Sequence, residues 1–219
     1  MTVINIKVVS DTVCPWCYVG RRKLQKAQQQ WLETHPGDSF SVRYAPYQLR
    51  PEWPKGPSAS KPKNEYYLEN FGPERTKEIH QRLRSAGEDV GIDFKFGGRM
   101  GNTRDSHRLI HLAQTLGPDV ESKLIESLFA GYFEQEKDIT SFDTLKDAAL
   151  AAGIPEDKFQ KAIVDGDDGG KEVDEAVAEV QRSGVRGVPK YYIQDAVRID
   201  GAREPADFLE AFKQVKESE

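Results

Sequence analysis

The sequence of 219 residues predicts an α/β fold in which a small sheet is interrupted by a large helical segment. Three observations lead to this prediction. A strand-like run at residues 6–10 leads into Cys14-Pro15-Trp16-Cys17 and then into a helical pattern. Strand signals are missing from residue 64 to residue 183, where the apolar residues follow a helical period. Strand-like runs return at residues 191–199, ahead of a last helical pattern.

The first two elements are a buried strand and an amphipathic helix. Val8 and Val9 are β-branched and favour a sheet. Pro15 suits the first turn of a helix, because its missing N–H would have no intrahelical partner there. We expect this helix over residues 15–33, ended by the Pro-Gly pair at 36–37. Its apolar face is expected to hold Leu24, Ala27 and Leu32.

A second strand and an irregular loop are predicted next. Phe40, Val42 and Tyr44 alternate with polar residues, which is typical of a strand. The strand–helix–strand order predicts a right-handed crossover that places this strand parallel to the first. Residues 46–62 are too rich in proline for regular structure. This loop is either a rim of a substrate groove or a plain linker.

Residues 64–183 predict helices only. Capping residues and glycines set the expected ends of these helices. Asn102 or Thr103 is expected to cap a helix that Gly117 closes, Pro118 to open the next, Ser141 to cap a third that ends at Gly153, and Pro155 to begin a short fourth. The sequence DGDDGG at residues 165–170 interrupts the pattern before a further helix that ends near Gly184.

The C-terminal segment predicts a hairpin followed by a helix. Residues 191–193 and 197–199 are β-branched or aromatic runs separated by a short polar turn. A last helix is expected to begin at Pro205. Its apolar face is expected to hold Phe208, Leu209, Phe212 and Val215.

Composition narrows the classes of partner. The formal net charge is −5, and charges of both signs are interspersed, so neither nucleic acid nor a membrane surface is an expected partner. No apolar run approaches the roughly 20 residues of a membrane span, and the first residues lack the features of a secretory leader. We therefore expect a cytoplasmic protein whose partners are thiol- or disulfide-containing proteins or small molecules. The oligomeric state stays open.

The only two cysteines, Cys14 and Cys17, predict thiol–disulfide chemistry. A helix N-terminus stabilises a thiolate, and the residues between the sulfurs, Pro15 and Trp16, are expected to tune the redox potential. Two alternatives compete: a pair of inert buried cysteines, and half of a zinc site completed by His107 and His111. Compact zinc sites use much shorter ligand separations, so we expect no bound metal.

The chain resembles the DsbA family, and more specifically its FrnE-like branch. The resemblance covers nearly the whole chain and depends on four segments in order: SDTVCPWCYVGRRKL, NTRDSHRLI, LFAGYFEQEKDIT and GVRGVPKYYI. It implies a thioredoxin-like βαβ…ββα domain, residues 1–62 and 184–219, with a large all-helical insertion, residues 63–183. Arg203 stands where that branch is expected to have glutamine, which leaves the role of this position open.

The site residues that follow are expectations. Cys14, the more N-terminal and exposed thiol, is expected to be the nucleophile, and Cys17 the resolving thiol. The resemblance implies a cis Val188–Pro189 peptide bond opposite Cys14, with the Val188 backbone pairing with an extended substrate. Taken alone, the GVP sequence is an ordinary turn before a strand. Four further residues are candidates for the groove, with helix capping and ordinary burial as the alternative. They are Asp11, Asn102, Thr103 and His107.

These features predict a thiol–disulfide oxidoreductase without a bound cofactor, with glutathione as a candidate co-substrate. Two other functions remain open. Kappa-class glutathione transferases and 2-hydroxychromene-2-carboxylate isomerases also resemble a thioredoxin-like domain with a helical insertion. They generally carry serine at the position of Cys14. A binding protein with a chaperone-like role would use the groove without turnover.

Overall fold

The structure is a computed structural model that describes residues 1–217. Its main sheet has four strands in the order β2-β1-β5-β6. The strands are β1 (Val3–Ser10), β2 (Ser39–Pro46), β5 (Lys190–Ile193) and β6 (Val197–Asp200). β2 runs parallel to β1, as the predicted crossover requires, whereas β5 runs antiparallel to β1 and β6 antiparallel to β5. The central strand β1 therefore ends at the same edge as β2, directly before the cysteine pair.

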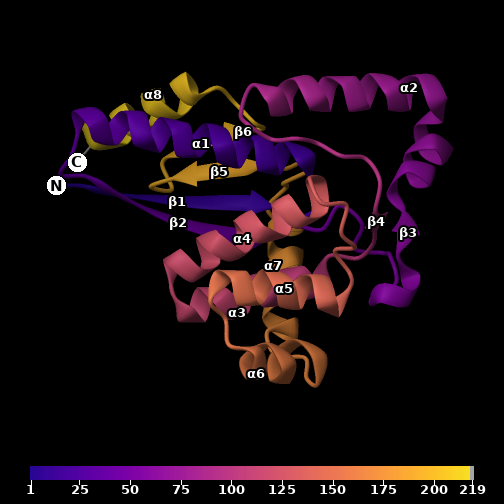
Figure 1. Cartoon of the computed structure of the whole chain (residues 1–219). Helices are drawn as coiled ribbons and strands as arrows, with labels where there is room; N and C mark the ends of the chain where they lie inside the picture. The colour runs from indigo at the N-terminus through magenta and orange to yellow at the C-terminus, as the bar shows by residue number, and fades with distance from the viewer. Residues whose placement is uncertain (218–219) are drawn as a thin grey trace.

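Residues 1–217 also form eight α-helices. They are α1 (Pro15–Thr34), α2 (Lys63–Glu88), α3 (Arg104–Leu116), α4 (Pro118–Phe133), α5 (Phe142–Ala152), α6 (Glu156–Phe159), α7 (Gly170–Arg182) and α8 (Pro205–Glu217). α1 and α8 pack together on one face of the sheet, and α3, α4 and α7 lie against β2 on the other (Figure 1). A 3-10 turn at Pro57–Ala59 and a π-helical turn at Gln160–Val164 complete the helical structure.

The buried face of α1 differs from the prediction at one position. Leu24 and Ala27 are buried, but Leu32 is exposed and Trp31 takes its place. Trp31 lies seven residues after Leu24, which keeps it on the apolar stripe, whereas Leu32 is rotated toward solvent. The Trp31 indole also donates a hydrogen bond to the Asp38 carboxylate at 3.1 Å, so its one polar atom is satisfied inside the core.

A two-residue strand at residues 99–100 contradicts the prediction of helices only over residues 64–183, and its partner strand at residues 61–62 contradicts the prediction that residues 46–62 lack regular structure. β3 (Lys61–Pro62) pairs antiparallel with β4 (Arg99–Met100). Strands of two residues are too short to show an alternating pattern, which is why the sequence gives no sign of them. The pairing fixes the end of the proline-rich loop against the segment that leads into α3.

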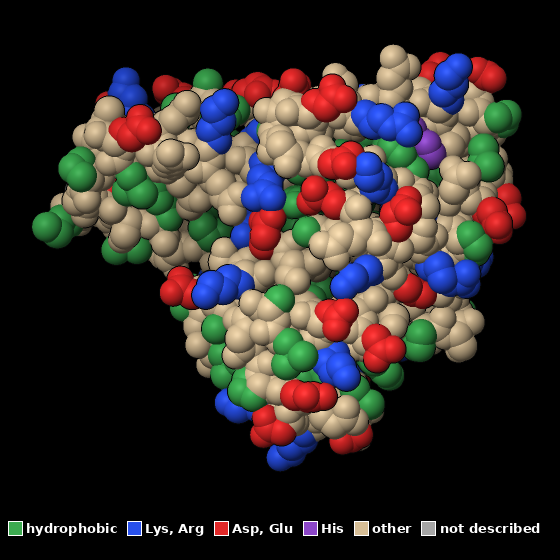
Figure 2. Space-filling view, in the orientation of Figure 1, with side chains coloured by type: hydrophobic (Ala, Val, Ile, Leu, Met, Phe, Trp, Pro, Cys, Tyr) green, Lys and Arg blue, Asp and Glu red, His purple; other side chains and the backbone are tan. Residues whose placement is uncertain are grey.

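Charges of both signs are mixed on the surface. Acidic and basic side chains are interspersed over the face that Figure 2 shows, without a continuous patch of either sign.

Among residues 1–217, none of the helices combines the length and the apolar character that crossing a membrane requires.

Candidate active site

The two cysteines lie where β1 passes into α1. Cys14 occupies the N-cap position with an extended backbone, φ −89° and ψ 112°, and Pro15 begins the helix. The Cys14 N–H donates to the Asp11 carbonyl at 3.1 Å, and the Cys17 N–H donates to the Cys14 carbonyl at 3.0 Å. These bonds form a tight turn that places both thiols at the N-terminus of α1. Both cysteines are free thiols in this structure.

The loop before β5 lies opposite Cys14. The Val188–Pro189 peptide bond is cis, and the Cys14 thiol contacts the Val188 carbonyl at 3.5 Å. The Pro189 carbonyl accepts a hydrogen bond from the Gly201 N–H at 2.9 Å, which attaches this loop to the end of β6. Two segments separated by more than 170 residues therefore meet at one sulfur atom.

Both thiols are buried, which corrects the expectation of an exposed Cys14. The exposed fraction is 5% for Cys14 and 2% for Cys17. Burial raises the pKa of the Cys17 thiol well above its ordinary value, and the neighbouring Cys14 sulfur raises it further. A hydrogen bond from the Ser10 side chain and one from the Asp11 backbone N–H act in the opposite direction. Burial and the neighbouring Cys14 sulfur therefore both favour the protonated form of Cys17.

Three aromatic residues lie around the thiols, and of these only Trp16 is a site residue that the sequence predicts. The Tyr191 side chain is fully buried, and its hydroxyl has no hydrogen-bond partner within residues 1–217. Burial raises the pKa of Tyr67 on α2 to about 12, with the Cys14 sulfur as the next cause. The Trp16 ring lies under the Arg82 guanidinium at 5.0 Å. In the sequence Tyr67 and Tyr191 are indistinguishable from core positions of a helix or strand, so no local signal marks them.

Asp11 and His107 lie together, but their side chains hold a loop. The Asp11 side chain is fully buried, and one of its oxygens accepts the Leu49 N–H at 2.7 Å. The other oxygen lies 3.5 Å from His107 Nε2, which is itself 2.9 Å from the Tyr47 carbonyl. Within residues 1–217, neither side chain hydrogen-bonds to a thiol. Both fasten the start of the proline-rich loop beside the turn that carries Cys14.

Asn102 performs a similar task, while Thr103 stands at the N-cap of α3. The Asn102 side-chain oxygen accepts the Arg104 N–H at 2.9 Å, as the capping prediction expected of this pair. The same oxygen accepts the Gln48 amide at 3.0 Å, and the Asn102 amide donates to the Trp53 carbonyl at 2.7 Å. Three of the four predicted groove residues, Asp11, Asn102 and His107, therefore attach residues 47–53 to the body of the protein.

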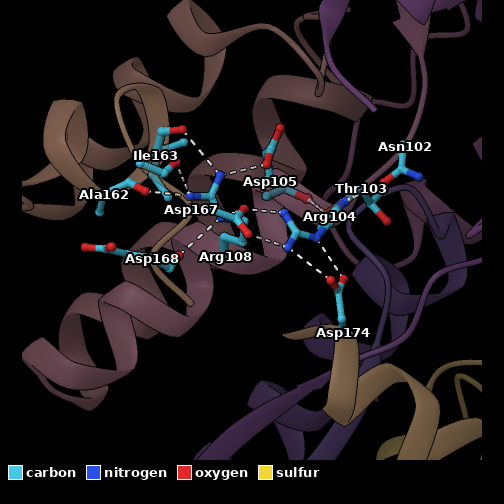
Figure 3. Close-up of polar contacts among 12 residues, drawn as sticks. Asn102, Thr103, Arg104, Asp105, Arg108, Ala162, Ile163, Asp167, Asp168 and Asp174 are labelled. Carbon is cyan, nitrogen blue, oxygen red and sulfur yellow. Dashed lines mark hydrogen bonds and ion pairs between the residues drawn. The ribbon is translucent and has the colours of Figure 1, made fainter. Parts of the chain in front are cut away.

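The arginines of the same segment face the opposite way, toward residues 162–174 (Figure 3). Arg104 forms ion pairs with Asp167 at 2.5 Å and Asp174 at 2.8 Å. Arg108, only 3% exposed, donates to four backbone carbonyls. They belong to Ala162, Ile163, Gly166 and Asp168. The acidic DGDDGG segment is thus a loop held by two arginines.

The zinc alternative requires His107 and His111 to lie beside the two cysteines, and the structure does not bring these four residues to one cavity. His107 and His111 line a cavity whose walls include neither cysteine. Within the described part of the chain, no three His, Cys, Asp or Glu side chains lie close enough together to hold a metal ion.

Comparisons with known proteins give the family. Residues 5–213 match the family model for the DSBA-like thioredoxin domain. The structure is similar to the probable DsbA oxidoreductase SCO1869 of Streptomyces coelicolor, with a TM-score of 0.86, 24% identity, and coverage of 99% of this chain and 91% of that one. A 2-hydroxychromene-2-carboxylate isomerase matches with a TM-score of 0.68 and 14% identity, over 98% and 97% of the two chains.

A third similar structure is the cytosolic disulfide reductase DsbM of Pseudomonas aeruginosa. It matches with a TM-score of 0.63 and 12% identity, over 98% of this chain and 100% of that one. DsbM has also been solved with GSH. At these identities the likeness of the structures establishes the shared fold.

Proposed function

Because this chain belongs to the family of the DSBA-like thioredoxin domain, we propose that it is a thiol–disulfide oxidoreductase that works through Cys14 and Cys17. One observation carries the proposal. The Cys14 sulfur lies at the start of α1 and 3.5 Å from the Val188 carbonyl, with Cys17 one helical turn later. An attacking thiol, a resolving thiol and a backbone edge for the substrate are then within reach of one another.

The proposed reaction is a pair of thiol–disulfide exchanges. The Cys14 thiolate attacks one sulfur of a substrate disulfide, so that a mixed disulfide forms as the substrate S–S bond breaks and the leaving thiolate takes up a proton. Cys17 then loses its proton and attacks the Cys14 sulfur, which releases the second substrate thiolate. Two electrons pass from the cysteine pair to the substrate. The reverse sequence oxidises a dithiol substrate.

The Val188 backbone supports the binding step. Its carbonyl accepts the Cys14 thiol, and its N–H makes no hydrogen bond within residues 1–217. A backbone donor and a backbone acceptor on one residue are what a peptide strand needs for pairing by β-augmentation. Pro189, which has no N–H, follows directly, so the substrate backbone meets no competing donor at that position. We propose that Pro15 and Trp16 tune the potential of the pair.

The resolving step is the one that depends on deprotonation of a buried thiol. Burial raises the pKa of Cys17, and the Ser10 hydroxyl and the Asp11 N–H offset part of that effect by hydrogen bonding to its sulfur. When Cys14 enters a mixed disulfide it no longer presents a thiol or thiolate beside Cys17, so one of the causes that raise the Cys17 pKa is removed. Resolution then follows attack in the required order.

Substrates, compartment and subdivision of the chain are further parts of the proposal. We propose thiol- or disulfide-containing proteins or small molecules as substrates, with glutathione as a co-substrate, in the cytoplasm. The similar structure of DsbM, a cytosolic disulfide reductase also solved with GSH, supports this assignment. We further propose a thioredoxin-like domain of residues 1–62 and 184–219 and a helical insertion of residues 63–183. Membership of the FrnE-like branch stays a prediction.

The similar fold of the 2-hydroxychromene-2-carboxylate isomerase favours a second candidate, a glutathione-dependent isomerase or transferase. Such an enzyme would bind glutathione without cycling between dithiol and disulfide. The two candidates differ in what Cys17 does. A resolving thiol is necessary for the oxidoreductase and unnecessary for the isomerase.

The Cys17→Ser variant tests the proposal directly. Attack by Cys14 survives in this variant and resolution does not, so mixed disulfides on Cys14 should accumulate. Non-reducing gels and intact-mass measurement after incubation with oxidised glutathione and with a cell extract would detect them, and the variant lacking both cysteines is the matched control. A Cys17→Ser protein that turns over like the wild type, or one that never forms an adduct, would refute the assignment.

A further inference from the structure

A cavity separate from the thiols lies between the sheet and the helical layer. It has a volume of about 220 Å³ and lies at the carboxyl ends of β1 and β2, beneath α3, α4 and α7. Cys14, Cys17 and Pro189 do not line it. The cavity is therefore distinct from the proposed thiol site, and occupation of one does not require occupation of the other.

The walls of this cavity favour an uncharged, largely apolar ligand. Most of the surface comes from aliphatic and aromatic side chains, with a polar minority; representative members are Ile110, Ile125, Phe129, Val173, Ser10 and His107. No lysine or arginine lines it, and the carboxylate that does, Glu172, is exposed. An anionic ligand such as glutathione would lie there without a cationic partner, which is unfavourable in a buried site.

His107 supplies a hydrogen-bond acceptor. Its Nε2 lies 2.9 Å from the Tyr47 carbonyl, and because a carbonyl can only accept, Nε2 carries the proton. In the neutral ring the lone pair is then on Nδ1, which makes no hydrogen bond within residues 1–217. The His107 side chain is 4% exposed and lines the cavity. A ligand that donates one hydrogen bond would satisfy this nitrogen.

The volume sets the size of the ligand. An engineered apolar cavity of about 150 Å³ takes up benzene. A cavity of about 220 Å³ has room for a somewhat larger molecule, with one ring and a substituent or two fused rings.

We propose that this cavity binds a small uncharged aromatic molecule with one N–H or O–H donor, of the size of phenol or indole, and that the donor bonds to His107. The ligand enters beside Glu172, the exposed residue of the lining. The end of β1 connects the cavity to the thiols, because Ser10 and Thr12 line the cavity and the carbonyl of Asp11, which lies between them in sequence, accepts the Cys14 N–H. Ligand affinity should consequently differ between the dithiol and disulfide forms, and by linkage the ligand should shift the redox equilibrium by the same factor.

The test uses indole and benzothiophene, which have nearly the same shape but differ in the N–H donor. Titration calorimetry of the reduced wild-type protein should give a dissociation constant on the order of 0.1–1 mM for indole. Benzothiophene should bind roughly tenfold more weakly, since one hydrogen bond is lost and His107 Nδ1 stays unpaired. Equal binding of the two probes would overturn the role of His107. This comparison uses only the wild-type protein, so it does not depend on the folding of a variant.

A filled cavity provides the control for location. Ala176 on α7 lines the cavity, whereas Ala178 on the same helix is exposed and does not. Ala176→Phe should abolish indole binding and Ala178→Phe should leave it unchanged, with folding of both verified by thermal unfolding. Binding that survives Ala176→Phe, or no binding at the solubility limit of indole, would overturn the site.

The coupling between indole binding and the redox state of Cys14 and Cys17 is tested separately. Indole should bind the oxidised and reduced proteins with affinities that differ at least threefold. Equal affinities in the two redox states would overturn the coupling. Binding of indole to Cys14→Ser should be retained, because that thiol does not line the cavity, so failure of the oxidoreductase assignment and failure of this site are distinguishable.

Discussion

Gly20 and Tyr191 form a contact whose removal tests how α1, β5 and the Pro189 loop fit together. A Cβ atom added at Gly20 would lie 2.3 Å from the Tyr191 hydroxyl oxygen and 3.1 Å from Pro189 Cγ. Tyr191 is fully buried, so its ring has no free space into which it can move. Overpacking of this kind costs about 1–3 kcal/mol, against a gain of up to about 1 kcal/mol in helix propensity for alanine over glycine. Gly20→Ala should therefore destabilise the protein by roughly 1–2 kcal/mol.

A second substitution tests whether the Tyr191 hydroxyl is the group that leaves no room for a Cβ atom at Gly20. Tyr191→Phe removes a buried hydroxyl that has no partner, so this change alone should be neutral or should stabilise by about 1 kcal/mol. In the Tyr191→Phe background the nearest atom to the new Cβ is Pro189 Cγ at 3.1 Å, and Gly20→Ala should then cost close to nothing. The coupling between the two sites should be about 1–2 kcal/mol.

Urea unfolding of the four reduced proteins measures this coupling through the midpoint at constant m-value. Gly131 on α4 offers a matched control, because its added Cβ would meet only Lys137 Cδ at 3.7 Å. Gly131→Ala should leave stability unchanged or raise it by up to about 1 kcal/mol. Additive effects of Gly20→Ala and Tyr191→Phe would contradict the packing described here, and with it the position of the Pro189 loop against α1.

Three other substitutions have defined outcomes. Cys14→Ser should abolish disulfide exchange in an insulin-reduction assay while leaving the thermal unfolding midpoint in place, and residual turnover would contradict the assigned nucleophile. Burial lowers the pKa of Lys63 from 10.5 to about 8, so the unfolded chain holds this proton more tightly and the free energy of unfolding should rise between pH 8 and pH 10.5. Lys63→Met should stabilise the protein by about 3 kcal/mol at pH 7. Urea titrations in which the variant and the wild type show the same pH dependence would contradict this role of Lys63. Asn102→Ala should speed amide hydrogen exchange of residues 47–53 by roughly 10- to 100-fold, whereas unchanged exchange would mean that other contacts hold this loop.

The order of the elements was predictable because the signals that define it are local. Pro15 at a helix start, alternation at residues 40–44, and the two short runs before Pro205 each depend on neighbouring residues alone. The predicted fold class, a thioredoxin-like sheet domain with a helical insertion, and the resemblance to the DsbA family are confirmed by the family match over residues 5–213. On the buried face of α1 the structure has Trp31 where Leu32 was expected. Apolar periodicity therefore places buried positions of a helix to within about one residue.

The candidate groove was harder to predict, since its contacts are set by residues distant in sequence. Asp11, Asn102 and His107 were selected as polar residues near the cysteine motif or in a family segment, and the structure shows that their partners are backbone groups of residues 47–53. Backbone donors and acceptors leave no mark in a sequence, because nearly every residue carries both. The Tyr191 hydroxyl could not be predicted either, because its position depends on the absence of a side chain at Gly20, which is distant in sequence.

The segment NTRDSHRLI illustrates why a specific motif can lack an obvious chemistry. Asn102, just before the N-cap of α3, holds the loop beside the thiols. The arginines of the same segment hold the opposite loop, so one short helix start connects both sides of the molecule. The carbonyls at the end of a helix have no intrahelical donors, and Arg108 supplies donors to the Ala162 and Ile163 carbonyls at the π-helical turn. A lysine has three donors around one atom, whereas the planar guanidinium spreads five donors over a fork. Only the fork can reach carbonyls on both the turn and the following loop, so the identity of this residue follows from backbone geometry. His107, between the two arginines in sequence, is then placed by the same helix at the wall of the cavity.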